Sequence, residues 1–296
     1  YGLIRLAIPL FPSVAASAGP LICILAVIGI IYGAWVASVQ RDVKRLVAYS
    51  SVSHLGLVVL GLFVFTPNGA TGAVLQMVNH GLTTGALFLI VGMLYERRHT
   101  RLIADYGGII KVMPMLGVIF WIVTFASIGL PPLNGFIGEF MILLGVFESR
   151  VVGHNILGAF AVTGIIWSAI YMLNMFAKVM LGTIKHKENT VLRDLDHREL
   201  FVLIPILILI FYIGLFSPNL TNKIQPDVVR TLGIVENAKI DSNSVMPRID
   251  KINKINTTNK SQEPTYGESE KPDLSSVKTQ VETMEPLDFG TGGSGE

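Results

Sequence analysis

Long runs of apolar residues alternate with short polar loops over the first 218 residues of the chain. A helix needs about 20 consecutive apolar residues to cross a bilayer core of ~30 Å. Six runs meet or approach this length, and helices are expected there because lipid offers no partners to strand edges or open backbone. The predicted spans are residues 20–39, 47–65, 68–95, 114–146, 153–181 and 200–217.

This pattern divides the chain into three segments. Residues 1–11 are expected to be the end of a truncated transmembrane helix, so the sequence is predicted to be the later part of a longer protein. Residues 12–218 form the six-helix membrane domain. Residues 219–296 form a polar tail, with a short surface helix predicted at 219–237. From about 238 onward the tail cannot bury enough apolar surface to offset the entropy of ordering, so we expect disorder.

Basic residues gather in alternate loops of the membrane domain. Twelve Lys or Arg lie in the loops after the first, third and fifth spans, whereas the opposite loops hold Arg150 alone. The positive-inside rule therefore places the basic loops in the cytoplasm, and the C-terminal tail on the outer side of a bacterial inner membrane. Because the charge alternates at every crossing, it supports six spans independently of hydropathy.

Composition narrows the class of protein further. The chain is 51% hydrophobic and 15% charged, where soluble domains carry about 25% charged residues. No basic cluster is interleaved with aromatic residues, so no nucleic-acid partner is expected. A single cysteine, Cys23, excludes an intrachain disulfide and an all-protein cysteine cluster. Since zinc spacings and phosphate loops are also absent from the sequence, we expect no metal and no cofactor on this chain.

Glu139 is the strongest functional candidate, because an ionisable group inside a span costs about 2.5–3.5 kcal/mol on insertion scales. It follows two consecutive prolines, Pro131 and Pro132, which remove amide donors from the predicted fourth span. We therefore expect two half-helices joined by a polar loop at membrane depth, with Asn134 capping the second half. Transporters build ion sites in this way. The alternative is a structural kink with Glu139 fixed by a neighbouring Lys or Arg.

Three other residues are weaker candidates for proton transfer. His80 lies in mid-span on one face with Gln76, beside a polar stripe of Asn79 and Thr83, and His54 follows a run of hydroxyl residues. Histidine suits a proton relay because its unperturbed pKa lies near physiological pH. The alternative role for both histidines is interhelical hydrogen bonding. Lys44 precedes the second span, where it is either functional or a topology anchor.

Two stretches of the sequence resemble a known family. Residues 42–56 (DVKRLVAYSSVSHLG) and 129–140 (GLPPLNGFIGEF) are similar to the signatures of the antiporter-like, proton-translocating subunits of respiratory complex I, the NADH:quinone oxidoreductase. The resemblance extends over about residues 1–218, and the tail beyond about 235 has no counterpart in it.

The resemblance implies an all-α integral membrane protein of two inverted five-helix repeats, of which the six spans form the second repeat plus a last helix. It places the terminal proton-transfer role on Glu139 and a hydrophilic axis at His54 and His80. The family's Glu–Lys pair and central lysine would lie upstream of Tyr1. It also implies other membrane subunits as partners, with NADH, FMN, iron–sulfur clusters and quinone on those partners and no redox chemistry on this chain.

The functional hypothesis is that redox chemistry elsewhere in the complex drives protons along His54, His80 and water to Glu139, and then outward. Three alternatives remain. The closest alternative is a subunit of a multisubunit sodium/proton antiporter, which shares the same motifs, and the next is a subunit of a membrane-bound hydrogenase. A structural membrane anchor, in which the buried polar residues serve only assembly, is the third.

Overall fold

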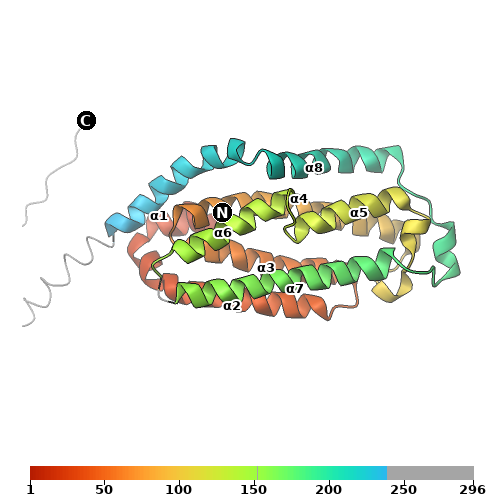
Figure 1. Ribbon diagram of the computed structural model, residues 1–296, viewed down its shortest axis with the longest axis horizontal. Helices are drawn as coiled ribbons and strands as arrows, with labels where there is room; N and C mark the ends of the chain where they lie inside the picture. Colours follow the sequence, from red (N-terminus) through yellow and green to blue (C-terminus); the bar gives the residue numbers. More distant parts are fainter. Residues whose placement is uncertain (152, 239–296) are drawn as a thin grey trace, which may run out of the picture. The chain divides into compact units, whose positions relative to one another are not determined.

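The computed structural model describes residues 1–151 and 153–238, which are almost entirely helical (Figure 1). Five helices are long and apolar enough to cross a membrane: α2 (Pro12–Ser38), α3 (Val43–Phe63), α4 (Pro67–Arg98), α7 (His154–Met180) and α8 (His197–Leu215). Short helices lie at the start of the chain and in the loops: η1 (Leu3–Ala7), α1 (Ile8–Leu10), η2 (Ile103–Asp105), η3 (Ile109–Lys111) and η4 (Lys187–Val191).

The fourth predicted span, residues 114–146, is broken into two half-helices. Helix α5 (Pro114–Ser127) ends before the prolines and α6 (Asn134–Glu148) begins after them, and the two follow each other end to end (Figure 1). The predicted broken helix is thus confirmed, because neither Pro131 nor Pro132 can donate the amide hydrogen that a continuous helix requires. The all-α bundle predicted from the apolar runs is likewise what the structure shows.

The first membrane helix is longer than its hydropathy predicts. Helix α2 begins at Pro12, eight positions before the expected start, and runs through Pro20. Residues 13–19 are mainly small and therefore weak in hydropathy, but alanine is the best helix former and extends the helix. The amide that Pro20 lacks costs one hydrogen bond, and membrane helices tolerate such a loss where neighbours pack against them.

Residues 218–238 form a further helix after α8, over the stretch where a surface helix was predicted. Val228 and Val235 on this helix are nevertheless buried, so one side of it packs against the rest of the described chain. The remainder of the predicted disordered tail, residues 239–296, lies outside the described residues.

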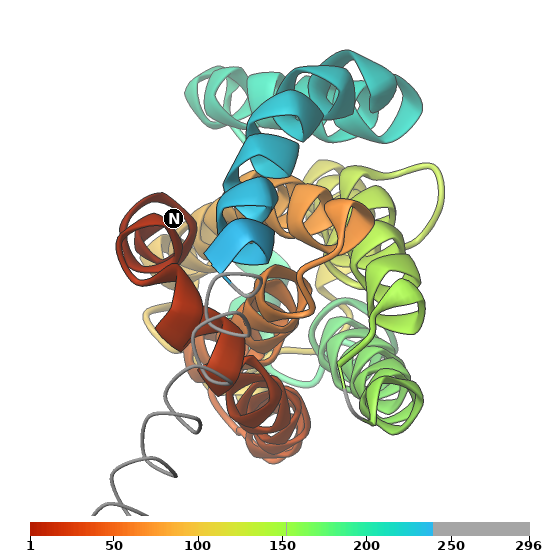
Figure 2. The same ribbon diagram turned by 90° about the vertical axis from the view of Figure 1, so that its left-hand side faces the viewer.

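Small residues let the central helices approach closely (Figure 2). A Cβ atom added to Gly33 of α2 would lie 2.7 Å from the backbone nitrogen of Ser53 on α3. A Cβ atom at Gly72 of α4 would lie 2.7 Å from the Cβ atom of Met141 on α6. Such contacts between glycine and a neighbouring backbone are typical of membrane helices, where close packing replaces the hydrophobic effect. They bring α2 against α3, and α4 against α6, the second half of the broken helix.

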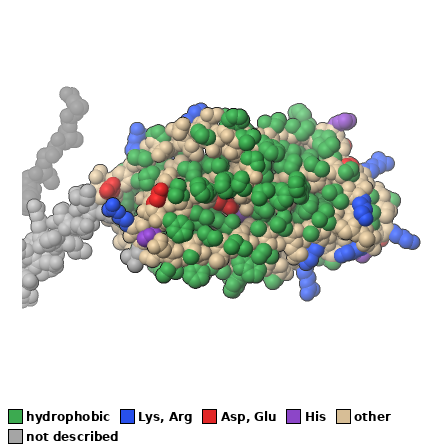
Figure 3. All heavy atoms as spheres, in the orientation of Figure 1, with side chains coloured by type: hydrophobic (Ala, Val, Ile, Leu, Met, Phe, Trp, Pro, Cys, Tyr) green, Lys and Arg blue, Asp and Glu red, His purple; other side chains and the backbone are tan. Residues whose placement is uncertain are grey.

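The outer faces of the bundle are apolar (Figure 3). Leu21, Ile28 and Trp35 follow one another along α2 and are each more than half exposed. Exposed apolar surface on this scale marks a face that contacts lipid or another protein. Most of the Lys and Arg side chains visible in Figure 3 lie at one end of the bundle, on the right, and a few lie toward the other end.

Loops at this basic end hold each other together. The guanidinium of Arg97, at the end of α4, donates two hydrogen bonds of 2.6 Å to the carboxylate of Glu199 on α8. Asp194 accepts hydrogen bonds from the backbone amides of Met115 and Leu116, so it caps α5 from a distant loop. These bonds fix α8 and the start of α5 to the end of α4.

The pair of Arg97 and Glu199 gives a test of this arrangement. Replacing either residue alone by methionine should destabilise the assembled protein by about 2 kcal/mol, below the roughly 3–5 kcal/mol of a fully buried pair because the side chains are 17% and 14% exposed. The double replacement should cost less than the sum of the two, since it leaves no unpaired charge. Thermal unfolding in detergent measures this, and additive losses would contradict a direct pair.

Candidate functional site

The carboxylate of Glu139 is buried where three helices meet. The residue lies on the second turn of α6 and is 5% exposed. Its Oε1 atom lies 3.2 Å from Nδ1 of His54 on α3. The Nε2 amide of Gln76 on α4 donates to the same oxygen at 3.3 Å. Glu139 is therefore held by an imidazole and an amide from two different helices.

Two asparagines fix the start of α6 against α4. Asn79 donates through Nδ2 to the backbone oxygen of Asn134 at 2.7 Å, and Asn134 donates back to Oδ1 of Asn79 at 3.3 Å. The predicted role of Asn134 as a helix cap is wrong, because its side chain makes no capping hydrogen bond and the residue is already helical. Its side chain instead donates to Asn79 on α4, the neighbouring helix. This contact lies between one and two turns before Glu139 along α6.

Glycines at the helix break leave space for the carboxylate. Gly129 has a φ of +72°, and a Cβ atom there would lie 2.6 Å from Oε2 of Glu139. Gly138, next to Glu139, lies so close to Oε1 of Gln76 that a side chain would displace the amide. Both positions need glycine to keep Glu139 and Gln76 in place.

The two predicted histidines lie side by side. The ring centroids of His54 and His80 are 5.4 Å apart, and Thr84 lies 3.2 Å from Nδ1 of His80. His54 is buried and His80 is half-buried. The structure therefore brings Glu139, His54 and His80 into one cluster.

Lys44 is not part of this cluster. It is exposed on the first turn of α3. Ten residues separate it from His54, which corresponds to about 15 Å along the helix axis. The structure therefore adds no contact between Lys44 and the buried polar residues.

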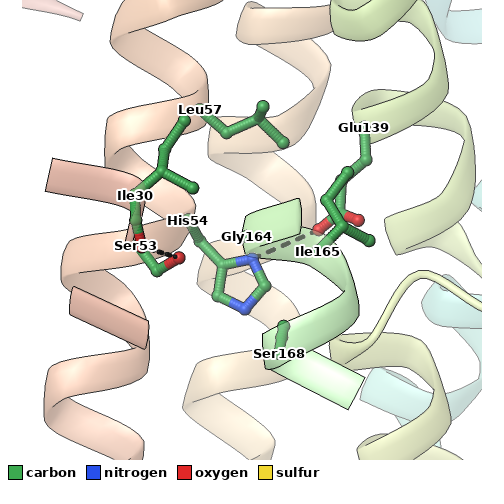
Figure 4. A pocket seen from close by; sticks show the side chains of 8 residues that line it. All are labelled: Ile30, Ser53, His54, Leu57, Glu139, Gly164, Ile165 and Ser168. Carbon is green, nitrogen blue, oxygen red and sulfur yellow. Dashed lines mark hydrogen bonds and ion pairs between the residues drawn. The ribbon is translucent and has the colours of Figure 1, made fainter. Parts of the chain in front are cut away.

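A cavity of about 10 Å³ adjoins the contact between His54 and Glu139 (Figure 4). This volume is enough for about one water molecule. Its polar lining consists of Ser53, His54, Glu139 and Ser168. Its apolar lining consists of Ile30, Leu57, Gly164 and Ile165.

Sequence reasoning missed Ser168 and Tyr171. Both lie on α7 and are buried, and the hydroxyl of Tyr171 donates to Oγ of Ser168 at 3.2 Å. The available signal was a hydroxyl pair spaced three residues apart inside an apolar helix, which places both groups on one face. The pair does not by itself indicate a functional site, because hydroxyl groups commonly form hydrogen bonds with the backbone of their own helix.

The cluster has the groups that proton transfer needs. Among the described residues, Glu139 forms its ion pair with His54 and none with Lys or Arg. This arrangement does not support the alternative in which a basic residue fixes the carboxylate permanently. A carboxylate and an imidazole within hydrogen-bond distance can pass a proton between them.

Comparison with known proteins identifies the family. The model of the NADH:quinone oxidoreductase/Mrp antiporter transmembrane family matches residues 1–167, more than half of the chain. The chain belongs to this family. The matched region contains both signature stretches, the two histidines and Glu139.

Relatives within the family agree with this placement. The chain is 46% identical over 232 residues to the NADH-quinone oxidoreductase subunit M of Rickettsia conorii, covering 78% of this chain and 46% of that protein. It therefore spans about half the length of the curated relatives it matches. Residues 28–60, 76–108 and 129–146 resemble subunit M more than its sister subunits, and the similarity to subunit M proteins confirms this interpretation.

Solved structures share the fold. A chain of respiratory complex I from Thermus thermophilus superposes with a TM-score of 0.74 at 34% identity, covering 79% of this chain and 48% of that chain. A chain of the Mrp complex from Dietzia superposes with a TM-score of 0.61 at 17% identity, covering 77% and 49% respectively. The second likeness supports the fold alone. Together these findings make the chain a multi-pass membrane protein.

Gly129 allows a test of how the carboxylate is held. Gly129→Ala and the control Gly153→Ala should each lose about 1 kcal/mol of stability, because both glycines have a positive φ. Gly129→Ala should lose about 1 kcal/mol more, since its Cβ meets Glu139 whereas nothing lies within 4 Å of a Cβ at Gly153. Thermal unfolding of the assembled protein measures the difference. Equal losses would show that Gly129 does not hold the carboxylate.

Proposed function

We propose that the protein containing this chain is a proton-translocating membrane subunit of an NADH:quinone oxidoreductase. The contact of 3.2 Å between buried Glu139 and His54 carries this proposal, because it sets a proton acceptor beside an imidazole at a break in a membrane helix. Similarity to subunit M proteins supports the choice of complex. An unpaired carboxylate at this depth would be costly, so the presence of Glu139 there favours a functional role.

Proton transfer at the site follows from the hydrogen bonds. While Glu139 is ionised and His54 neutral, Nδ1 of His54 carries the hydrogen and donates it to Oε1 of Glu139. Protonation of His54 from the side of His80 then lets the Nδ1 hydrogen move to the carboxylate. Gln76 keeps Oε1 in position by donating a hydrogen bond to it. The amide does not compete for the proton, because it cannot accept one at neutral pH. Glu139 then releases its proton outward.

Energy for this step comes from outside the chain. Moving one charge against 100 mV takes about 2.3 kcal/mol. We propose that electron transfer from NADH to quinone supplies it on partner subunits, which hold NADH, FMN, iron–sulfur clusters and quinone. On this proposal the chain holds no cofactor and performs no redox chemistry, and its partners are the other membrane subunits of the complex.

We propose that the basic end of the bundle faces the cytoplasm of a bacterium. Lys and Arg gather at that end (Figure 3), and cytoplasmic loops carry this excess. Arg150 then lies on the outer side, together with the C-terminal tail.

A subunit of a sodium/proton antiporter is the second candidate, because the matching family model includes Mrp antiporters. The buried carboxylate would serve both functions. Dependence of transport on sodium distinguishes the two, since proton translocation by an oxidoreductase requires NADH and not a sodium gradient.

Replacement of Glu139 tests the function directly. Glu139→Gln in the complete subunit, assembled in its complex, should abolish the proton transport that depends on this subunit, because glutamine cannot accept a proton. Glu148→Gln is the matched control: it removes an exposed carboxylate from the last turn of the same helix, where it accepts from Asn68. NADH-driven acidification in vesicles measures both, and normal transport by assembled Glu139→Gln would refute the proposal.

Labelling tests the orientation. Lys187→Cys and Arg150→Cys each place a thiol at an exposed position at opposite ends of the bundle, whereas natural Cys23 is fully buried. In intact cells a membrane-impermeant thiol reagent should label Arg150→Cys and should label Lys187→Cys only after the membrane is opened. The reverse pattern would contradict the proposed orientation.

A further inference from the structure

The contact with Glu139 occupies only one of the two ring nitrogens of His54. Its Nε2 atom is buried and has no hydrogen-bond partner among the described residues. The whole residue is 6% exposed. In Figure 4 the ring directs Nδ1 toward Glu139, while Nε2 lies on the side where Ser168 approaches. A buried polar atom without a partner costs about 1–3 kcal/mol, so this nitrogen needs a partner.

The adjoining cavity has the size and the polar lining for that partner. A volume of about 10 Å³ holds about one water molecule. Such a water needs two to four polar neighbours, and the lining offers His54, Ser168, Ser53 and Glu139. Ser53 donates its own hydrogen to the backbone oxygen of Ile30, so it can act here as an acceptor.

Helix α7 continues this polar path away from Glu139. The Tyr171 hydroxyl donates to Oγ of Ser168, which leaves the Ser168 hydrogen free to point into the cavity. Ser50, one turn before His54 on α3, also interacts with the Tyr171 side chain. Because α3 begins at the basic end, Ser50 lies on the side of His54 nearer that end. Ser50, Ser168 and Tyr171 are each no more than 2% exposed.

We propose that this cavity binds one water molecule, which joins Tyr171 and Ser168 to Nε2 of His54 and forms a second proton route to Glu139. This inference rests on the proposed function, since it adds a route to the same carboxylate. The route differs from that of His80 as far as His54, where the two meet. His80 contacts His54 from α4 and bonds Thr84 rather than Ser168.

The hydrogen bonds along this route share one direction. Tyr171 donates to Ser168, Ser168 donates to the water, and the water donates to Nε2 of His54. When a proton enters at Tyr171, each oxygen passes on its own hydrogen and takes the next one, so that Nε2 gains a hydrogen. His54 is then an imidazolium, and its Nδ1 hydrogen moves to Oε1 of Glu139. One proton has entered at Tyr171 and one has reached the carboxylate.

The rest of the cavity lining is apolar. Ile30, Leu57 and Ile165 offer no side-chain hydrogen bond to the water. Since the volume admits about one water molecule, that water has Ser53, His54, Glu139 and Ser168 as its polar neighbours. Ser168 and Tyr171 are therefore relay residues, and they reach Glu139 through His54.

Two parallel routes make a distinct prediction for combined variants of the intact complex. Tyr171→Phe alone and His80→Ala alone should each lower Glu139-dependent proton transport by about twofold, because the other route remains. The double variant should lose this transport as completely as Glu139→Gln, which is a non-additive result. NADH-driven acidification per electron transferred, measured in vesicles, is the readout.

Controls separate this inference from the proposed function. Thr163→Val removes a hydroxyl from the exposed face of the same helix and should transport normally. Ser168→Ala should behave as Tyr171→Phe does, and Ser168→Thr, which keeps the hydroxyl, should restore transport. If Glu139→Gln abolishes transport but the double variant transports as well as His80→Ala alone, the second route is refuted and the proposed function stands. Normal transport by Glu139→Gln would refute both.

A structural measurement keeps the inference testable if the variants do not assemble. In a density map of the native complex that resolves ordered water, a peak should lie within hydrogen-bond distance of both Nε2 of His54 and Oγ of Ser168. An empty cavity at that resolution would overturn the proposal, whatever the variants do.

Discussion

Every polar group buried in this bundle must find its partner inside the bundle, because lipid provides none. Glu139 meets this constraint with His54 and Gln76 rather than with a lysine or arginine. A permanent positive charge would hold the carboxylate ionised. The imidazole and the amide both contact Oε1 and carry no permanent charge. On the proposed function, the contacts that accommodate the buried carboxylate are also those that let it take up and release a proton.

The break between α5 and α6 is held by contacts with neighbouring helices. Asn79 and Asn134 bind each other across α4 and α6, and glycines let these helices approach until backbone and side chain are in direct contact. Close packing of this kind limits the positions that Glu139 can adopt. The cavity that adjoins the carboxylate has a volume of about 10 Å³, near the size of one water molecule.

The basic end serves a different purpose. Arg97, Glu199 and Asp194 connect three segments that are far apart in the sequence, at the end of the bundle away from the Glu139 side of the break. Exposed Lys44 lies at this end as well, away from the residues buried around Glu139. Charge is concentrated where water can solvate it, and the interior carries few ionisable groups.

Much of this could be predicted from the sequence. Apolar runs of membrane length indicated the helices, and two prolines before a carboxyl group indicated the break. Ionisable residues in mid-span indicated Glu139, His54 and His80 as candidates. Each of these signals is local, because it reflects the free-energy cost of placing that residue in a membrane helix. Residue spacing along one helix could not predict contacts between helices. Only the tertiary structure paired Gln76 with Glu139, turned Asn134 from a helix cap into a partner of Asn79, and brought Ser168 and Tyr171 beside His54. Those contacts depend on how closely the helices pack and how each is rotated, which the whole set of small and large side chains decides together.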